Sequence, residues 1–230
     1  MNIEEKLLTI NKMGRPGYTL KGVKKIVVHY VGNPNTTAIA NRNYFDNLRK
    51  QTEIYSSSHY IVGLNGEVIR CIPENEVSYH AGNLEVNYTS IGIETCHPDA
   101  TGKFSEITLN SLVDLLIDIC KRYKLNPLTD IIRHYDVTGK KCPLYYVNNQ
   151  VEWDKIKQRV NSYIAVQDVK ISQTYVVIPS IGLNCRQAPD VNSRRIKAYV
   201  VGTRLDIIEV RNGWGKTRDG WVSMQYLRKI

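Results

Sequence analysis

The first two thirds of the chain alternate short β-branched runs with longer stretches in which hydrophobic residues recur at helical spacing. The β-branched runs are typical of buried strands, and Asn65-Gly66 between two of them predicts a hairpin. The strongest helical stripe follows Thr108, a residue type that caps helices. Strands are predicted over residues 25–31, 58–64, 67–72, 89–95 and 130–133, and helices over 36–50, 109–123 and 153–164. Because a hairpin and helical crossovers coexist, we predict an α/β fold with a mixed central sheet flanked by helices.

The last quarter of the chain lacks a helical stripe and contains short β-rich runs separated by turns. Asn212-Gly213 and Asp219-Gly220 are typical hairpin turns. Many short strands in 58 residues (173–230) indicate a small all-β barrel. Helical spacing is lost over 165–172, which predicts a linker between a domain at 1–164 and a domain at 173–230. The expected strands of the second domain are 174–178, 183–186, 204–210, 214–216 and 220–223.

Composition excludes several classes of protein. Of the 230 residues, 42% are hydrophobic and 23% charged, which is typical of a globular protein and not of a disordered one. No apolar run approaches the roughly 18 residues of a membrane helix, so no membrane insertion is expected. Glu4 and Glu5 stand where a secretory signal would need an apolar core, which predicts synthesis in the cytoplasm without a signal peptide.

The two predicted domains differ in net charge, and the positions of the cysteines indicate different roles for them. Residues 1–172 carry 21 basic and 18 acidic side chains (+3), whereas 173–230 carry 10 and 4 (+6). Five widely spaced cysteines do not suggest a disulfide framework. Cys71, Cys96 and Cys120 have the pattern of core residues. Cys142 lies in a basic loop with Lys140 and Lys141, where positive charge is expected to favour the thiolate.

All five histidines precede residue 135, and two of them follow apolar strand runs. These are His29 and His134, and Cys142 comes eight residues after the second. Two imidazoles and a thiolate suit Zn²⁺ and leave a fourth position for water, whose pKa falls to about 7. The spacing alone favours the alternative, a hydrogen-bonded strand histidine and an unligated loop thiol.

Five ordered motifs carry a family resemblance over residues 23–164. The chain resembles the zinc-dependent N-acetylmuramoyl-L-alanine amidases of the peptidoglycan-recognition and T7-lysozyme-like superfamily. The motifs are VVHY at 27–30 with Gly32-Asn33, SSHYIV at 57–62, HAG at 80–82, SIGIE at 90–94 and RHYDVTGKKCP at 133–143.

The resemblance implies zinc ligands at His29, His134 and Cys142. It implies that Glu94 is the general base and proton donor and that Lys140 stabilises the oxyanion. Without the family, a solvated strand end is the favoured interpretation of Glu94, and Lys140 is one of two ordinary loop lysines. Where some relatives have a catalytic tyrosine this chain has Ser58, which places more of the catalysis on Glu94.

Other polar residues of the motifs receive weaker assignments. His80 is expected to line the cleft and contact substrate, with a structural hydrogen bond as the alternative. His59 is assigned to packing or to support of a ligand, and His97 to a loop. Asp136 either orients His134 or caps its loop, and we favour the cap.

The second domain resembles a bacterial SH3-like domain in its pattern GLNCR at 182–186, NGWGK at 212–216, DGWVS at 219–223 and Tyr226-Leu227. At least one of Trp214 and Trp221 is expected in the barrel core. Basic residues with aromatics also occur in nucleic-acid-binding modules, but no such motif is present, so no nucleic acid is expected. The favoured partner of this domain is a wall peptide or polyanion.

The resemblances together imply an endolysin that acts on bacterial peptidoglycan. It would hydrolyse the amide between N-acetylmuramic acid and L-alanine, using zinc. Release from the cytoplasm through a phage holin-type pore is favoured over a host autolysin. Two alternatives remain open: a peptidoglycan-binding protein without catalysis, and a zinc peptidase of the stem peptide.

Overall fold

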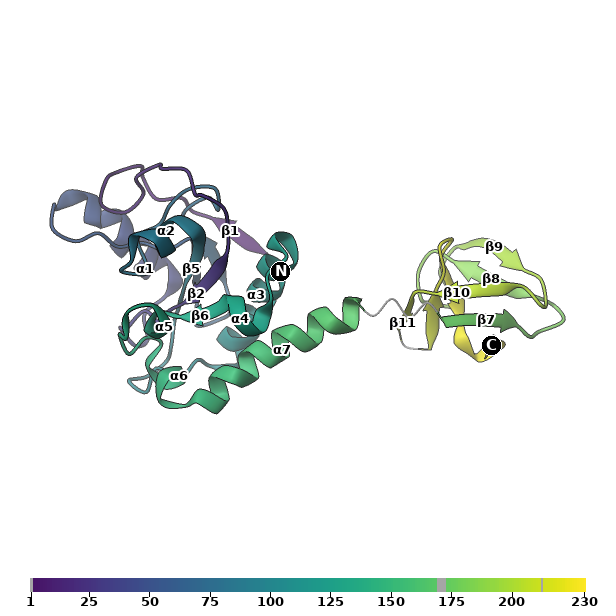
Figure 1. Cartoon of the computed structure of the whole chain (residues 1–230). Coiled ribbons are helices and arrows are strands. Elements are labelled where there is room, and N and C mark those ends of the chain that lie inside the picture. Colours follow the sequence, from purple (N-terminus) through teal and green to yellow (C-terminus); the bar gives the residue numbers. More distant parts are fainter. Residues whose placement is uncertain (1, 169–172, 212) are drawn as a thin grey trace. The chain divides into compact units, whose positions relative to one another are not determined.

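The chain forms two compact units, Met1–Ala165 and Val166–Ile230 (Figure 1). The structure is a computed structural model and describes residues 2–168, 173–211 and 213–230. Helix α7 (Gln150–Asp168) continues through the first four residues of the predicted linker 165–172, and the other four lie outside the described residues.

A six-stranded mixed sheet forms the centre of the first unit, which confirms the predicted fold class. The strand order is β1-β4-β3-β5-β2-β6, with β3 and β4 antiparallel and every other neighbouring pair parallel. The strands are β1 (Ile3–Glu5), β2 (Lys25–Val28), β3 (Tyr60–Val62), β4 (Val68–Arg70), β5 (Ser90–Thr95) and β6 (Ile131–Arg133).

Helices cover both faces of this sheet, and its strands are therefore buried on both sides. Tyr60 and Val62 join the core packed by α3 (Glu106–Tyr123) and α7, while Ile61 between them joins the core beside α1 (Ala38–Asn47). This alternation is the two-residue period of a strand. The smaller helical elements are η1 (Leu48–Lys50), α2 (Leu84–Thr89), α4 (Pro127–Asp130), α5 (His134–Thr138) and α6 (Leu144–Asn148).

The first turns of the helices show how local sequence sets their starts. Thr37 caps α1, since its hydroxyl accepts the N–H of Ala40 at 3.2 Å. The prediction of Thr108 as the cap of α3 is wrong. Ser105 is the cap and accepts the N–H of Thr108, which lies within the first turn. Both residue types are good caps, and the one outside the helical backbone takes the role.

The second unit contains two antiparallel sheets, ordered β10-β7-β14 and β11-β12-β13-β8-β9. Trp221 is buried in its interior, as expected for at least one of the tryptophans, and Trp214 is partly exposed. The prediction of one strand over 204–210 is wrong, because the chain passes from one sheet to the other at Ile208. The strands are β7 (Gln173–Val177), β8 (Leu183–Arg186), β9 (Arg195–Tyr199), β10 (Arg204–Ile207), β11 (Glu209–Arg211), β12 (Trp214–Lys216), β13 (Trp221–Ser223) and β14 (Leu227–Lys229), with η2 at Met224–Tyr226.

Within the described residues, no helix has both the length and the apolar character needed to cross a membrane.

Candidate metal centre

Three neighbouring parallel strands bring polar side chains together at their carboxyl ends. Val28 of β2 pairs with Ile93 of β5 and with Arg133 of β6. The residues that follow these partners are His29, Glu94 and His134. They therefore lie side by side at the edge where parallel sheets place their ligand sites.

His29, His134 and Cys142 form one cluster, in which the potential ligand atoms lie within 4.8 Å of one another. The Cys142 Sγ lies 3.7 Å from His29 Nδ1, and the two imidazole centroids are 4.7 Å apart. The loop that carries Cys142 is held beside α5 by the Tyr135 N–H, which donates to the Cys142 carbonyl at 3.0 Å. All three side chains are buried, and a set of two imidazoles and one thiol fits a zinc ion.

Burial determines the protonation of these groups in the metal-free chain. It lowers the pKa of His29 well below its ordinary value and that of His134 to about 4, so both rings are neutral and retain a lone pair for a metal. The expectation that positive charge favours the Cys142 thiolate is wrong for this state. Burial raises the pKa of Cys142 to about 12 and outweighs the opposing charge of Lys140. A cation bound at the cluster would reverse this balance and release the thiol proton.

Glu94 and Lys140 line the same hollow as the cluster, a cavity of about 300 Å³. Burial raises the pKa of the Glu94 carboxyl to about 8, and the charge of Lys140 acts in the opposite direction. The Glu94 Oε2 is buried and has no hydrogen-bond partner in the part of the chain that the structure describes. A buried, unpartnered carboxyl beside a potential metal site is suited to proton transfer.

A second hollow of about 300 Å³ adjoins the first, and the two share Ser56, His80, His134 and Lys140. Tyr44 lines the first hollow, whereas Tyr55 and Tyr79 line the second. Sequence reasoning missed Ser56 and these tyrosines, since no spacing pattern distinguishes them from other surface residues.

His80 lies beside the cluster, and only 7% of its surface is exposed. Its Nδ1 is 3.1 Å from His29 Nε2, and its Nε2 is 3.3 Å from the Ser90 hydroxyl. Its ring also borders both hollows. The structural hydrogen bond considered from the sequence is thus present, and contact with substrate stays a prediction.

The remaining polar residues of the motifs lie outside the cluster. Ser58 is buried and donates to the Tyr60 carbonyl. His97 packs on Tyr30 with ring centroids 5.1 Å apart, and its Nδ1 lies 2.7 Å from the Asp99 carbonyl.

His134 was expected in a loop, but it begins the short helix α5. Asp136 caps that helix, because its carboxylate accepts both the main-chain N–H and the guanidinium of Arg133. Asp136 thus has a capping role, but at the start of a helix and not in the loop that the sequence suggests.

The ring of His59 is fully buried and neutral. Its Nδ1 accepts the Gly92 N–H at 3.0 Å, and its Nε2 lies 2.9 Å from the Glu76 carbonyl. Burial lowers its pKa to about 4, whereas an unfolded chain has the ordinary value near 6.5. Above pH 6.5 the ring is neutral in both states. Below it, only the unfolded state takes up the proton until the pH approaches 4.

We therefore expect His59 to destabilise the metal-free fold as the pH falls from 7 to 5. One unit of pKa difference corresponds to about 1.4 kcal/mol, so the loss is about 2 kcal/mol at pH 5. The measurement is urea unfolding of the wild type and of His59→Asn in chelator, followed by helical circular dichroism. The free energy of unfolding of the wild type, relative to that of His59→Asn, should fall by that amount between pH 7 and pH 5. A difference between the two proteins that does not change with pH would contradict the assignment.

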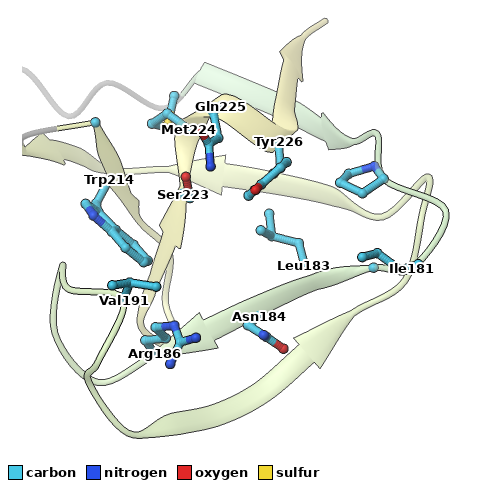
Figure 2. A pocket seen from close by; sticks show the side chains of 13 residues that line it. Ile181, Leu183, Asn184, Arg186, Val191, Trp214, Ser223, Met224, Gln225 and Tyr226 are labelled. Atoms are coloured by element: carbon cyan, nitrogen blue, oxygen red, sulfur yellow. The ribbon is translucent and has the colours of Figure 1, made fainter.

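The second unit has its own cavity, of about 610 Å³. Figure 2 shows Trp214 beside Val191 at one end, Tyr226 toward Ile181 at the other, and Leu183 between them. Ile181 and Val191 are 97% and 64% exposed, and Arg186 adds a positive charge to the wall of the cavity. Exposed apolar side chains around a hollow are typical of an interaction site.

The fold and the cluster define an α/β domain with a potential metal site, and comparison with known proteins gives its family. Residues 19–144 match the model of the N-acetylmuramoyl-L-alanine amidase family, and the chain belongs to that family. The chain is 35% identical over 180 residues to the N-acetylmuramoyl-L-alanine amidase BlyA of Bacillus subtilis (strain 168), covering 70% of this chain and 47% of BlyA. It is 33% identical over 183 residues to the amidase CwlL of Bacillus licheniformis, covering 74% and 49%. The chain therefore spans about half the length of these relatives.

Solved structures show the same fold. The catalytic domain of XlyA superposes with a TM-score of 0.59 at 27% identity, covering 70% of this chain and 99% of that domain. A mutant endolysin from Bacillus subtilis superposes with a TM-score of 0.58 at 29% identity, covering 69% and 98%. The recognition of the amidase family from the five sequence motifs is thereby confirmed.

Proposed function

We propose that the chain is a zinc-dependent peptidoglycan amidase, which hydrolyses the amide between N-acetylmuramic acid and the L-alanine of the stem peptide. The observation that carries the proposal is the cluster of His29, His134 and Cys142 in the same hollow as Glu94 and Lys140. Membership of the amidase family supports the choice of bond. The names of the relatives and the endolysin structures support a role in wall lysis.

His29, His134 and Cys142 would hold the zinc ion through one nitrogen each of the two imidazoles and through the thiolate. When bound, zinc supplies an acidified water and a positive charge beside the scissile carbonyl, and it lowers the pKa of the neighbouring carboxyl. Glu94 then takes a proton from the attacking water and delivers it to the leaving amine of L-alanine. Lys140, exposed at the mouth of the hollow, stabilises the negative charge that develops on the carbonyl oxygen.

The products of digestion test this assignment directly. Purified peptidoglycan is digested with the zinc-loaded protein, and the soluble fragments are analysed by mass spectrometry. Intact stem peptides that begin with L-alanine are expected, together with glycan strands that have lost their peptides. Cuts within the stem peptide would instead indicate the zinc peptidase, and tight binding without products would indicate a wall-binding protein.

We further propose that the second unit is an SH3-like wall-binding domain. Its strands are short and antiparallel, and the domain carries a net charge of +6 (10 basic and 4 acidic residues in 173–230). Its cavity combines Trp214 and Tyr226 with Arg186, which suits a short wall peptide that bears a carboxylate. The positive charge also accelerates encounter with an anionic wall, an effect that salt screens.

Replacing Trp214 with alanine is expected to weaken binding to intact walls about tenfold while leaving hydrolysis of soluble muropeptides unchanged. The reason is that the substitution removes aromatic surface from the cavity and changes none of the proposed catalytic groups, which all belong to the first unit. Val210→Ala is the matched control, because Val210 is 46% exposed on the same unit and lies outside the cavity. Pelleting with walls measures binding. Equal pelleting of both variants would show that the cavity is not the binding site.

A further inference from the structure

The hydrogen bonds around His80 determine which of its ring nitrogens carries the proton. The Ser90 hydroxyl donates its only hydrogen to the Val86 carbonyl at 2.5 Å. Toward His80 Nε2, at 3.3 Å, the same oxygen therefore acts as an acceptor. It follows that Nε2 of His80 carries a hydrogen.

His80 is a neutral ring with a single N–H. The ring is buried, and its two nitrogens contact the His29 ring and the Ser90 hydroxyl, neither of which carries a negative charge that would hold a second proton. With the hydrogen on Nε2, its Nδ1 has a free lone pair and accepts from His29 Nε2 at 3.1 Å. His29 is then protonated at Nε2, so its Nδ1, the atom 3.7 Å from the Cys142 Sγ, is the nitrogen with the free lone pair.

The backbone holds the His80 ring firmly in this position. Asn87 accepts the N–H groups of both His80 and Ala81, at 3.1 and 2.8 Å. Gly92 of β5 lies directly against the ring, and a Cβ on Gly92 would approach the His80 Cγ to 2.4 Å. A glycine in the middle of this strand is therefore explained by the space that the imidazole occupies.

We propose that His80, oriented by Ser90 and seated on Gly92, is a positioning residue that fixes His29 in the tautomer able to bind the metal through Nδ1. This inference rests on the proposed function, because it concerns zinc bound by His29. Without an acceptor at this place, His29 also populates the tautomer with hydrogen on Nδ1, which offers no lone pair toward Cys142. Partners of metal-binding histidines commonly change metal affinity by about 10–100-fold.

Two variants of His80 separate hydrogen bonding from filling of space. His80→Phe keeps a ring of similar size but has no acceptor for His29. His80→Asn leaves a carbonyl oxygen near the position of Nδ1. Zinc affinity is measured in the full chain by competition with a chromophoric chelator, and thermal unfolding of the metal-free proteins shows whether each variant is folded.

We expect His80→Phe to bind zinc about 10–100-fold more weakly than the wild type, and His80→Asn to recover most of the loss. Independently of any metal, long-range ¹H–¹⁵N spectra of the wild type should show His29 protonated at Nε2. Equal zinc affinity of all three folded proteins, or a metal-free His29 that is protonated mainly at Nδ1, would overturn the positioning role and leave the proposed function intact. A folded wild type that binds no zinc would overturn both.

Discussion

Cys142→Ala is expected to abolish both zinc binding and wall hydrolysis. The substitution removes one of three ligands and the only anionic one, and the two remaining imidazoles hold Zn²⁺ far less tightly. Zinc affinity should fall by more than the roughly 100-fold that is lost when a hydrogen-bond partner of a metal ligand is replaced. Metal content after dialysis and clearing of wall suspensions are the two measurements.

Cys120→Ala is the matched control for that experiment. Cys120 is as buried as Cys142, with exposures of 1% and 2%, and both thiols have a pKa of about 12 in the metal-free chain. Loss of a buried sulfur therefore costs packing energy in both variants, but only Cys142 faces the histidines. Undiminished hydrolysis by Cys142→Ala, or equal loss of metal from the two variants, would refute the ligand assignment.

Glu94→Gln is expected to lower the rate of hydrolysis by about 100-fold or more while leaving zinc and wall binding unchanged. Glutamine has nearly the same shape as glutamate but cannot accept and return a proton, and removal of a positioned base costs 10²–10⁴-fold. Single-turnover kinetics on a soluble muropeptide isolate the chemical step, and zinc content is measured on the same samples.

The control variant is Glu67→Gln, which makes the same chemical change in the hairpin between β3 and β4. There the Glu67 carboxylate accepts the Asn65 N–H. Its turnover should match the wild type. A Glu94→Gln protein that hydrolyses the muropeptide at the wild-type rate would assign the proton transfer to another group.

The pattern of hydrophobic residues was sufficient for the elements long enough to display a period. Strand β5 and helices α3 and α7 lie where the sequence predicts them, within a few residues. The short helices α2, α4, α5 and α6 have four to six residues and were not predicted. One turn of helix is too short to show a 3.6-residue period, and its stability comes from tertiary contacts and caps such as Asp136.

The small second unit shows the limit of local pattern more sharply. The sequence suggests one strand over 204–210, but Ile207 is buried in the core of the second unit and Ile208 is 38% exposed where the chain changes sheets. Strands β9 and β14 were missed as well, because charged and exposed residues dominate them. Which neighbour a short strand pairs with depends on contacts distant in sequence.

By itself, the sequence determined the alternation of strands and helices, the family motifs, and the identity of His29, His134, Cys142, Glu94 and Lys140 as the residues to examine. Only the tertiary structure decided how they act together. It brought Cys142 to His29 across 113 residues, and burial then kept that thiol protonated where the sequence suggested a thiolate. It also placed Nδ1 of His80 at 3.1 Å from Nε2 of His29. Hydrogen-bond direction and desolvation depend on which groups meet in space, and no spacing along the chain records that.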